Sequence, residues 1–185
     1  MGGDAALHIA APEAAGFVDR RTLTDQYERI VSAYGPALVR LTACYESRPH
    51  AREDLLQEIL LAIWKTLPGF RGECSQKTFV LRVAHNRCLT HVWRRGKSAE
   101  SPAELPEVPD PRKSPETMAI DNLRRESLLA AIRALPVNYR QAITLALEDL
   151  APAEIAAVLG VTENNVAVRL NRARKALRSI LEERP

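Results

Sequence analysis

The sequence predicts an all-α protein made of two small helical domains that a proline-rich linker joins. Apolar residues recur at helical spacing along most of the 185 residues, and no stretch alternates in the way a β-strand does. Between about residues 97 and 115, large apolar residues are almost missing and five prolines occur. Such a segment cannot bury a core. We therefore predict a loose tail over 1–23, domains over 24–96 and 116–185, and a linker over 97–115.

The first predicted helices flank a Gly-Pro pair. Thr24 suits the N-cap of a helix that runs through Tyr34. Gly35-Pro36 then breaks or kinks the chain, and Pro36 suits the first turn of a continuation, because proline lacks the backbone N–H that later helical positions need. Pro49 begins the next helical segment in the same way.

A strong apolar stripe follows within residues 51–67. Its members recur every three or four positions, as one face of a helix requires: Leu55, Leu56, Ile59, Leu60, Ile63 and Leu67. Pro68-Gly69 ends this helix, and Ser75 caps a further helix that extends to about Arg95. The residues of that helix expected to face the core are Phe79, Val83 and Ala84.

Helical periodicity returns at about residue 116. One helix ends at Pro136, and the segment VNYRQAITLALEDL forms a second. Pro152 lies in the first turn of a third helix, which ends at Gly160, and Thr162 caps a fourth. The apolar residues that predict the first of these helices are Leu123, Leu128, Leu129, Ile132 and Leu135.

Residues 152–175 have the layout of a helix-turn-helix, a motif whose second helix enters the major groove of DNA. Small Ala156 lets the two helices approach closely, and Gly160 allows the sharp turn. Over 161–181 there are five basic residues and one acidic residue, a balance that suits phosphate contacts. The outward-facing residues are short polar or apolar ones suited to base edges and basic ones suited to phosphates: Asn164, Asn165, Val168, Asn171, Arg169, Arg172, Arg174 and Lys175.

A second basic segment covers residues 71–97, with seven basic residues and one acidic residue. Aromatic residues lie among the basic ones, which suits a nucleic-acid strand whose bases stack on side chains. The simpler alternative is that Phe79 belongs to the core and that Trp93 covers the end of the helical bundle. The candidates for a nucleic-acid contact are Phe70, Arg71, Lys77, Arg82, Asn86, Arg94 and Arg95.

Residues 51–67 also carry an acidic face. Four residues spaced three and four apart line this face: Asp54, Gln57, Glu58 and Leu61. Trp64 is expected to be exposed beside the end of the face. An ordinary solvated face is one interpretation. A docking surface for a basic partner is the other.

Other classes of function find no support in the sequence. No apolar run of about 18 residues occurs and the N-terminal residues do not form a secretory signal, so we expect a cytoplasmic protein without membrane insertion. Cys44, Cys74 and Cys88 form no CxxC pair and have no ligand-like spacing with the histidines, so reduced thiols are expected and no metal site. No catalytic triad or phosphate-binding loop is present, so we expect neither an enzyme nor a cofactor.

Together these segments resemble the extracytoplasmic-function sigma factors of bacterial RNA polymerase, over about residues 24–95 and 116–182. AREDLLQEILLAIWKTLPGFRG resembles the clamp-binding helix of sigma region two, and RVAHNRCLTHVWRR the helix used for the minus-ten element. LPVNYRQAITLALEDLAPAEIAAVLGVTENNVAVRLNRARKAL resembles region four, which reads the minus-35 element. The resemblance implies as partners core polymerase (clamp helices and flap), promoter DNA as duplex and melted strand, and an anti-sigma factor.

The resemblance also implies roles for single residues. Asp54, Gln57, Glu58, Leu61 and Trp64 would contact the polymerase clamp; Phe70, Arg71, Lys77, Arg82, Asn86, Arg94 and Arg95 would lie on the minus-ten surface; Thr162, Asn164, Asn165, Val168, Arg169, Asn171, Arg172 and Lys175 would lie on the minus-35 element. The chain departs from the common family pattern at Asn164-Asn165, where many members carry Gly-Thr, and at Gln76 and Thr90. A different minus-35 preference is therefore expected.

Two alternatives stay open from the residues alone. A stand-alone helix-turn-helix regulator would need only the second domain, and a helical adaptor would leave both basic segments without a purpose. The linker also leaves the arrangement of the free protein open. It is long enough for the two domains to pack together, and we expect such packing to hide the helices that read DNA.

Overall fold

The structure is a computed structural model that describes residues 20–97 and 115–183. These residues form seven α-helices and one short 3-10 turn (η1) and no strand, which confirms the all-α prediction for this part of the chain. Most of the predicted tail and nearly all of the predicted linker lie outside the described residues. The elements are α1 (Arg20–Ala43), α2 (Pro49–Thr66), η1 (Leu67–Gly69), α3 (Gln76–Lys97), α4 (Pro115–Ala134), α5 (Val137–Leu147), α6 (Pro152–Leu159) and α7 (Glu163–Glu182).

The first helix is longer than the sequence predicts. It is one continuous helix from Arg20 to Ala43 with Pro36 inside it, so of the predicted break or kink at Gly35-Pro36 the break is wrong, and the predicted cap at Thr24 is wrong as well. The hydroxyl of Thr24 instead donates to the carbonyl of Arg20 (2.9 Å), one turn back within the helix. Ile30 and Leu38 lie on either side of the proline and are fully buried. Keeping the helix continuous buries both together, which offsets the backbone hydrogen bond that proline cannot make.

The starts of the next two helices are as predicted, and so is the inward direction of the three residues named on α3. Pro49 lies in the first turn of α2, and the hydroxyl of Ser75 accepts a hydrogen bond from the backbone N–H of Thr78 (3.0 Å). Ala84 is fully buried, and Phe79 and Val83 are half-buried and pack against the core. The fully buried apolar stripe of α3 consists of Val80, Leu81, Ala84 and Cys88.

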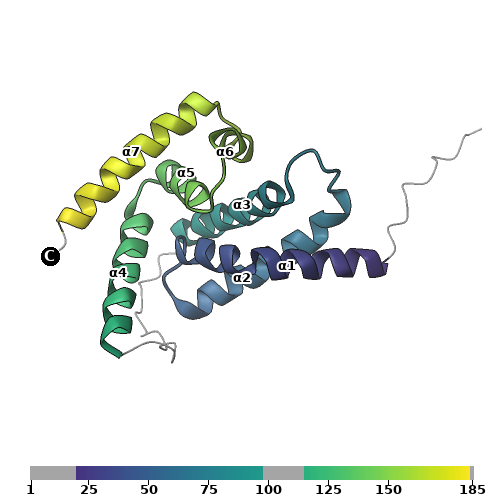
Figure 1. Cartoon of the computed structure of the whole chain (residues 1–185), viewed down its shortest axis with the longest axis horizontal. Coiled ribbons are helices and arrows are strands. Elements are labelled where there is room, and N and C mark those ends of the chain that lie inside the picture. The colour runs from purple at the N-terminus through teal and green to yellow at the C-terminus, as the bar shows by residue number, and fades with distance from the viewer. Residues whose placement is uncertain (1–19, 98–114, 184–185) are drawn as a thin grey trace, which may run out of the picture.

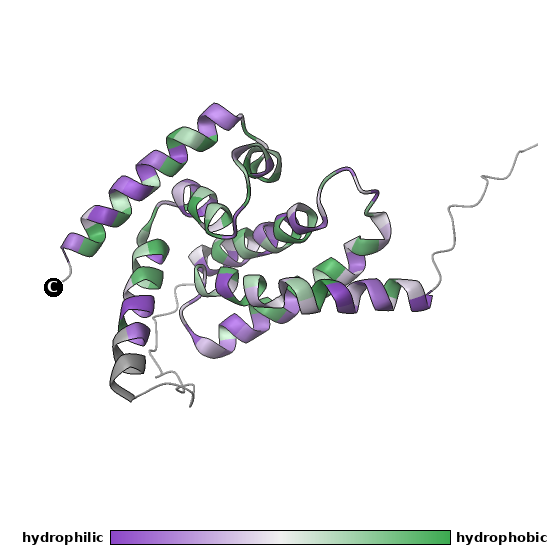
Figure 2. Ribbon diagram, in the orientation of Figure 1, coloured by the Kyte–Doolittle hydropathy of each residue, from purple (hydrophilic) through white to green (hydrophobic). Residues whose placement is uncertain are grey.

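The C-terminal helices form the predicted helix-turn-helix. Gly160 ends α6 with a positive φ of 64°, which glycine adopts without strain, and the hydroxyl of Thr162 accepts from the backbone N–H of Asn165 (3.3 Å). Ile155 and Ala156 on α6 and Val166 on α7 are buried between the helices. In Figure 2 the helices carry hydrophobic and hydrophilic residues on different sides, as amphipathic helices of a small protein do.

Two groups of helices, the N-terminal bundle (α1–α3) and the C-terminal bundle (α4–α7), pack directly against each other (Figure 1). Helix α6 lies on α3, and the buried apolar side chains of both bundles form one continuous cluster. The carboxylate of Glu154 on α6 accepts hydrogen bonds from Thr78 (2.6 Å) and Ser75 (3.2 Å) at the start of α3. These three side chains join the helix-turn-helix to the N-terminal bundle.

The end of α1 makes the second set of contacts between the bundles. Arg40 donates two hydrogen bonds to the carboxylate of Glu148 (2.9 and 2.6 Å), whose side chain is only 8% exposed. The hydroxyl of Tyr45 lies 3.4 Å from that of Thr144 on α5, and Arg133 on α4 donates to the carbonyl oxygen of Ala43 (2.9 Å). The described residues therefore join the bundles through specific polar contacts as well as through apolar packing.

We expect the Arg40–Glu148 pair to show energetic coupling. In a double-mutant cycle, Arg40→Gln and Glu148→Gln should together cost less than the sum of the two single substitutions, with a coupling of about 0.5–3 kcal/mol. Urea unfolding of the full chain measures it. Arg29→Gln, also exposed on α1, is the matched control and should show no coupling to Glu148→Gln. A coupling of zero for Arg40 would mean that the two bundles do not hold this contact in solution.

Candidate nucleic-acid interface

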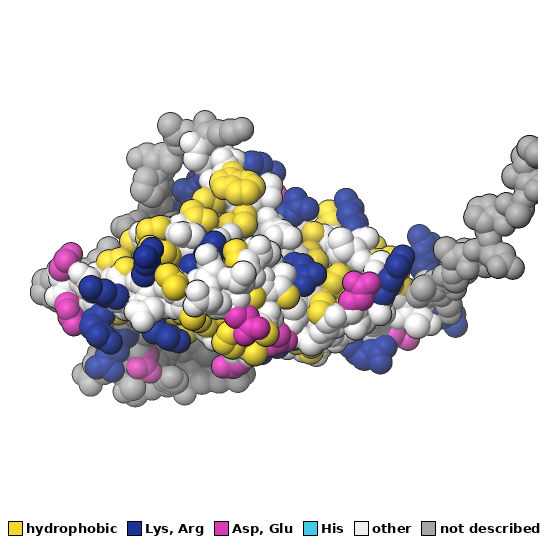
Figure 3. All heavy atoms as spheres, turned by 90° about the horizontal axis from the view of Figure 1, so that it is seen from above, with side chains coloured by type: hydrophobic (Ala, Val, Ile, Leu, Met, Phe, Trp, Pro, Cys, Tyr) yellow, Lys and Arg dark blue, Asp and Glu magenta, His cyan; other side chains and the backbone are white. Residues whose placement is uncertain are grey.

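Helix α7 presents the residues predicted to read duplex DNA. Its inner side is anchored by Val166, Leu170 and Ala173, all buried against the other helices of the C-terminal bundle. The opposite side is exposed and basic, and Figure 3 shows Lys and Arg side chains gathered over the end of the molecule where α7 lies. All eight predicted minus-35 residues are on this accessible side, seven of them exposed and Arg169 half-buried: Thr162, Asn164, Asn165, Val168, Arg169, Asn171, Arg172 and Lys175.

The contact between the bundles leaves this face open. The expectation that packing of the two domains hides the DNA-reading helices is therefore wrong for α7. The reason is geometric: Glu154 of α6, and not the outer side of α7, faces the N-terminal bundle. What the packing does cover is the start of α3, where Thr78 is buried beneath Glu154. The contact between the bundles therefore buries part of the basic segment 71–97, whereas it leaves the basic helix α7 exposed.

A cavity of about 290 Å³ lies beside the start of α3. Its walls include Phe70 and Phe79, whose rings lie 4.7 Å apart at their centres, together with Arg71 and Arg82. The Nε atom of Arg82 is buried behind this wall and has no hydrogen-bond partner in the described structure. Two aromatic rings beside two guanidinium groups can receive a planar, polar group such as a nucleobase.

The structure brings together some of the predicted minus-ten residues and separates others. Phe70, Arg71 and Arg82 share the cavity, whereas Lys77 does not line it. Asn86 is exposed farther along α3. The two sequence interpretations of Phe79, as an aromatic among the basic residues and as a core residue, are compatible, because its half-buried ring packs on the core and also lines the cavity.

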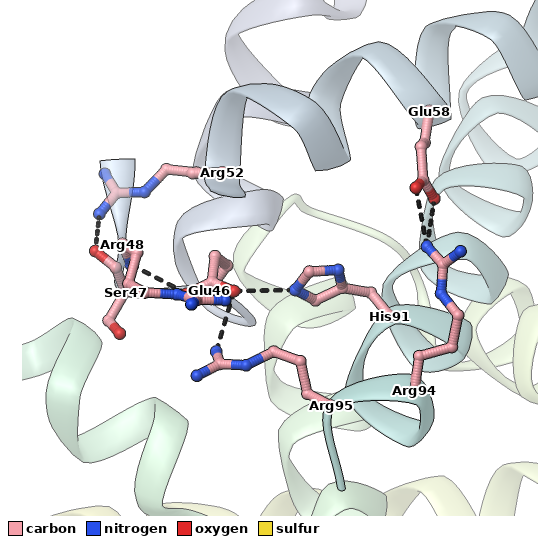
Figure 4. A network of polar contacts seen from close by, with 8 residues as sticks. All are labelled: Glu46, Ser47, Arg48, Arg52, Glu58, His91, Arg94 and Arg95. Atoms are coloured by element: carbon pink, nitrogen blue, oxygen red, sulfur yellow. Dashed lines mark hydrogen bonds and ion pairs between the residues drawn. The ribbon is translucent and has the colours of Figure 1, made fainter. Parts of the chain in front are cut away.

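The last turns of α3 form a network around a buried carboxylate (Figure 4). Glu46, which is fully buried, accepts hydrogen bonds from the backbone N–H of Arg48 (2.9 Å) and from Arg95 (2.9 Å), and lies 2.8 Å from Nε2 of His91. Burial alone would raise the pKa of Glu46, but the hydrogen bonds from Arg48 and His91 and the charge of Arg95 outweigh it and hold that pKa below its ordinary value. Glu46 was not among the predicted functional residues, because a single carboxylate in a loop follows no periodic pattern.

A second ion pair of α3 is more exposed. One guanidinium nitrogen of Arg94 lies 2.7 and 3.0 Å from the two carboxylate oxygens of Glu58 on α2 (Figure 4). Both Arg94 and Arg95, predicted to contact DNA, therefore already have a carboxylate partner. A DNA phosphate would have to compete with Glu58 or Glu46 for each guanidinium.

The acidic face of α2 is present, with one correction. Asp54, Gln57 and Leu61 are exposed, and Leu61 is 52% exposed although it is apolar. Trp64 is half-buried and not exposed as predicted, because its ring packs edge-on against Tyr27 with 5.2 Å between the ring centres. The face therefore consists of carboxylate and amide groups beside one accessible leucine.

Two of the three cysteines are buried, and the third, Cys74, is a free, half-buried thiol that lines the cavity beside α3. The described residues contain no group of three or more His, Cys, Asp or Glu that could hold a metal ion. Burial raises the pKa of the Cys44 thiol to about 11 and that of Cys88 further still, which keeps both protonated at neutral pH. None of the described helices combines the length and apolar character needed to cross a membrane.

Comparison with known families gives two matches. Residues 30–98 match the family described as Sigma-70 region 2, and residues 125–177 match Sigma-70, region 4. Both matches fall on the helices that carry the surfaces described above: α1–α3 for the first and α4–α7 for the second.

Several relatives carry the same family name. The chain is 28% identical to the ECF RNA polymerase sigma factor SigE of Mycolicibacterium smegmatis, over 84% of this chain and 61% of that protein. It is 33% identical to the ECF RNA polymerase sigma factor SigG of Mycobacterium tuberculosis, over 76% of this chain and 45% of that protein. The chain thus matches less than two thirds of the length of either. The chain is 28% identical to the ECF RNA polymerase sigma-E factor of Escherichia coli, over 67% of this chain and 70% of that protein.

Two solved structures share the fold. CnrH in complex with the cytosolic domain of CnrY aligns with a TM-score of 0.64 and 20% identity, over 88% of this chain and 91% of that one. The sigma factor RpoE from Bartonella quintana, in complex with the anti-sigma factor NepR, aligns with a TM-score of 0.68 and 19% identity, over 87% of this chain and 99% of that one. At these identities the likeness concerns the fold alone.

We expect the two carboxylates that bind α3 to differ strongly in their effect on stability. Glu46→Gln should lower the free energy of unfolding at pH 7 by roughly 3 kcal/mol, because it breaks a buried ionic network. Glu58→Gln, the matched control, should cost less than about 1 kcal/mol, since its pair with Arg94 is partly exposed. Urea unfolding of the full chain measures both values.

The effect of Glu46 should also depend on pH. Since the pKa of Glu46 is lowered in the folded chain, its charge stabilises the fold above the ordinary carboxyl pKa and this contribution disappears as the pH falls through the lowered value. The difference between the parent chain and Glu46→Gln should therefore shrink below about pH 4.3. A difference that stays constant from pH 7 down to the acid range would contradict the assignment of Glu46 as a charged partner.

Proposed function

The chain belongs to the extracytoplasmic-function group of the sigma-70 family, and from this premise we propose that it binds core RNA polymerase and directs transcription initiation at specific promoters. In this proposal residues 24–96 act as sigma region 2, which reads and melts the minus-ten element, and residues 116–185 act as region 4, which reads the minus-35 element. The observation that supports it most is the presence, in one chain, of an exposed basic recognition helix and a separate aromatic cavity of a size for a base.

The proposed minus-35 contact uses α7 as the recognition helix. Asn164, Asn165 and Asn171 are exposed on its outer side, and asparagine can make two hydrogen bonds to the edge of adenine in the major groove. Arg172 and Lys175 are exposed on the same helix and would neutralise phosphates. Bases and phosphates would thus be contacted from one rigid element whose start is fixed by the Thr162 cap.

The proposed minus-ten contact uses the cavity that Phe70 and Phe79 line. A base that leaves the duplex could stack against the exposed side of these rings, beside the guanidinium groups of Arg71 and Arg82 in the same walls. Unstacking a base costs a few kcal/mol, which contacts in the cavity would have to offset. Melting on this account needs binding energy and no catalytic group.

The proposed polymerase contact uses the exposed face of α2. Asp54 and Gln57 would meet basic or polar groups on the clamp, and Leu61 would supply apolar contact at its centre. Glu58 would contribute after it exchanges Arg94 for a partner on the polymerase, which would also release Arg94 toward DNA. In this way polymerase binding and DNA binding would favour each other.

A stand-alone regulator explains less of the structure. Its helix-turn-helix would account for α7, but not for an open cavity with aromatic walls on the other bundle. Membership of the sigma family and the region 2 match over 30–98 also favour the sigma factor. As partners we propose core polymerase, promoter DNA and an anti-sigma factor, the last by analogy with the complex of RpoE and NepR. A chain with these partners would act in the cytoplasm.

Transcription reconstituted from purified components tests this proposal. Core polymerase with the full chain should start RNA at a specific promoter selected from a random pool, and core alone should not. Asp54→Arg should weaken binding to core by tenfold or more, since it reverses a charge on the docking face. Asp25→Arg, the same change at an exposed position of α1, is the control and should leave core binding unchanged. No binding to core by the parent chain would favour the stand-alone regulator.

Arg172→Ala tests the phosphate contact of α7. The variant holoenzyme should bind duplex promoter DNA more weakly whatever the sequence, and the slope of log affinity against log salt should fall by about one, because one phosphate contact is lost. Filter binding or fluorescence anisotropy at several salt concentrations measures the slope. Arg124→Ala, at an exposed position of α4, should leave the slope as it is. An unchanged slope in Arg172→Ala would remove this residue from the interface.

A further inference from the structure

A second cavity, of about 450 Å³, lies at the junction of the two bundles and is lined by three arginines. Arg95 comes from α3 of the N-terminal bundle, whereas Arg133 and Arg140 come from α4 and α5 of the C-terminal bundle. Ser47 and Tyr45 also line it, and none of the described lining residues is an aspartate or a glutamate. Its volume is in the range of small-molecule sites.

Positive charge in this cavity exceeds the negative charge that balances it. Glu46 behind the wall serves both Arg95 and Arg48, and Glu126 lies 3.5 Å from Arg133. Among the described residues no carboxylate forms an ion pair with Arg140. That guanidinium donates to the carbonyl oxygens of Arg133 and Leu135 and lies over the ring of Tyr45, 5.6 Å from its centre.

Arg140 has further signs of incomplete pairing. Its Nε atom is buried, and no residue that the structure describes accepts a hydrogen bond from it. Burial lowers the pKa of its guanidinium, and the charge of Arg133 acts in the same direction. A partly buried cation without a counter-ion is unfavourable, and buried charges in proteins are normally paired. An anion in this cavity would offset the repulsion between these guanidinium groups.

We propose that this cavity binds the phosphate groups of a small phosphorylated molecule and that the bound anion holds the two bundles together. Guanidinium groups recognise phosphate oxygens by paired hydrogen bonds, and three of them suit a ligand with at least two negative charges. Because the arginines come from both bundles, a ligand that contacts Arg95 and Arg133 at once stabilises the joined arrangement over any arrangement in which the bundles have parted. The site lies apart from α7 and from the cavity beside Phe70.

Calorimetric titration of the full chain with sodium pyrophosphate tests the site. We expect a Kd below about 1 mM at low salt, and a rise in the thermal midpoint as pyrophosphate is added, since the ligand binds the folded chain. Arg95→Gln and Arg133→Gln should each weaken binding by tenfold or more. Arg124→Gln removes the same charge from an exposed position of α4 outside the cavity and should bind as the parent does.

Several outcomes would overturn the proposal. One is a Kd weaker than about 1 mM for the parent chain. Another is a loss of affinity in Arg124→Gln equal to that in the cavity variants, which would show general charge attraction only. The third is full binding in both cavity variants. Each cavity variant also loses a structural contact, Arg133→Gln its bond to the carbonyl of Ala43 and Arg95→Gln its pair with Glu46, so circular dichroism and the thermal midpoint without ligand check that both variants are folded before their binding is compared. A single-stranded oligonucleotide that binds through Arg133 while pyrophosphate does not would assign the cavity to a nucleic-acid strand instead. The titration needs no polymerase, so its failure would leave the proposed function untouched.

Discussion

Most polar groups at the end of α1 are buried and need hydrogen-bond partners from the protein in place of water. The arrangement of the whole molecule depends on which residues supply these partners. Over residues 40–46 the chain turns from α1 toward α2 while most of its side chains are buried. Its partners come from both bundles: Glu148 for Arg40, Arg133 for the carbonyl of Ala43, Thr144 for Tyr45, and Arg95 with His91 for Glu46. An unpaired buried carboxylate or carbonyl is costly, so this one segment fixes both the last turns of α3 and the position of the C-terminal bundle.

This constraint affects the two surfaces proposed to bind DNA differently. The outer face of α7 takes no part in it and stays open to solvent. Arg95 and Arg94, in contrast, are held by Glu46 and Glu58, so carboxylates occupy the guanidinium groups that phosphates would use. The pair of Arg94 with Glu58 is partly exposed and can exchange at little cost, whereas Glu46 is fully buried and would leave an uncompensated charge if Arg95 departed. Arg94 is therefore the more available of the two for a DNA contact, and Arg95 the more structural.

The features predictable from the sequence are those that depend on neighbours along the chain. The caps at Ser75 and Thr162 and the turn at Gly160 were predicted because each needs a particular residue type at a particular place in a helix. The break at Pro36 was predicted wrongly because burial of residues on both sides outweighs the local preference of proline. The pairing of Arg40 with Glu148 joins residues 108 positions apart, and no periodicity marks such a contact. The same holds for Glu46 and for the cavity at Arg140.

The apolar core does not require the positive charge that lies at the junction of the two bundles. The bundles could be joined by packing alone, yet the described contacts bring Arg133 and Arg140 beside Arg95 with too few carboxylates to balance them. Excess positive charge opposes the joining of two bundles, and apolar burial together with the Arg40–Glu148 pair has to outweigh it. The stability of such a junction depends more on salt and bound anions than that of a purely apolar junction. Salt and anions screen or neutralise the repulsion between the arginines, while they leave the free energy of apolar burial nearly unchanged. The joined arrangement is therefore a state whose stability the ionic composition around the chain can adjust, without any change to the surface of α7.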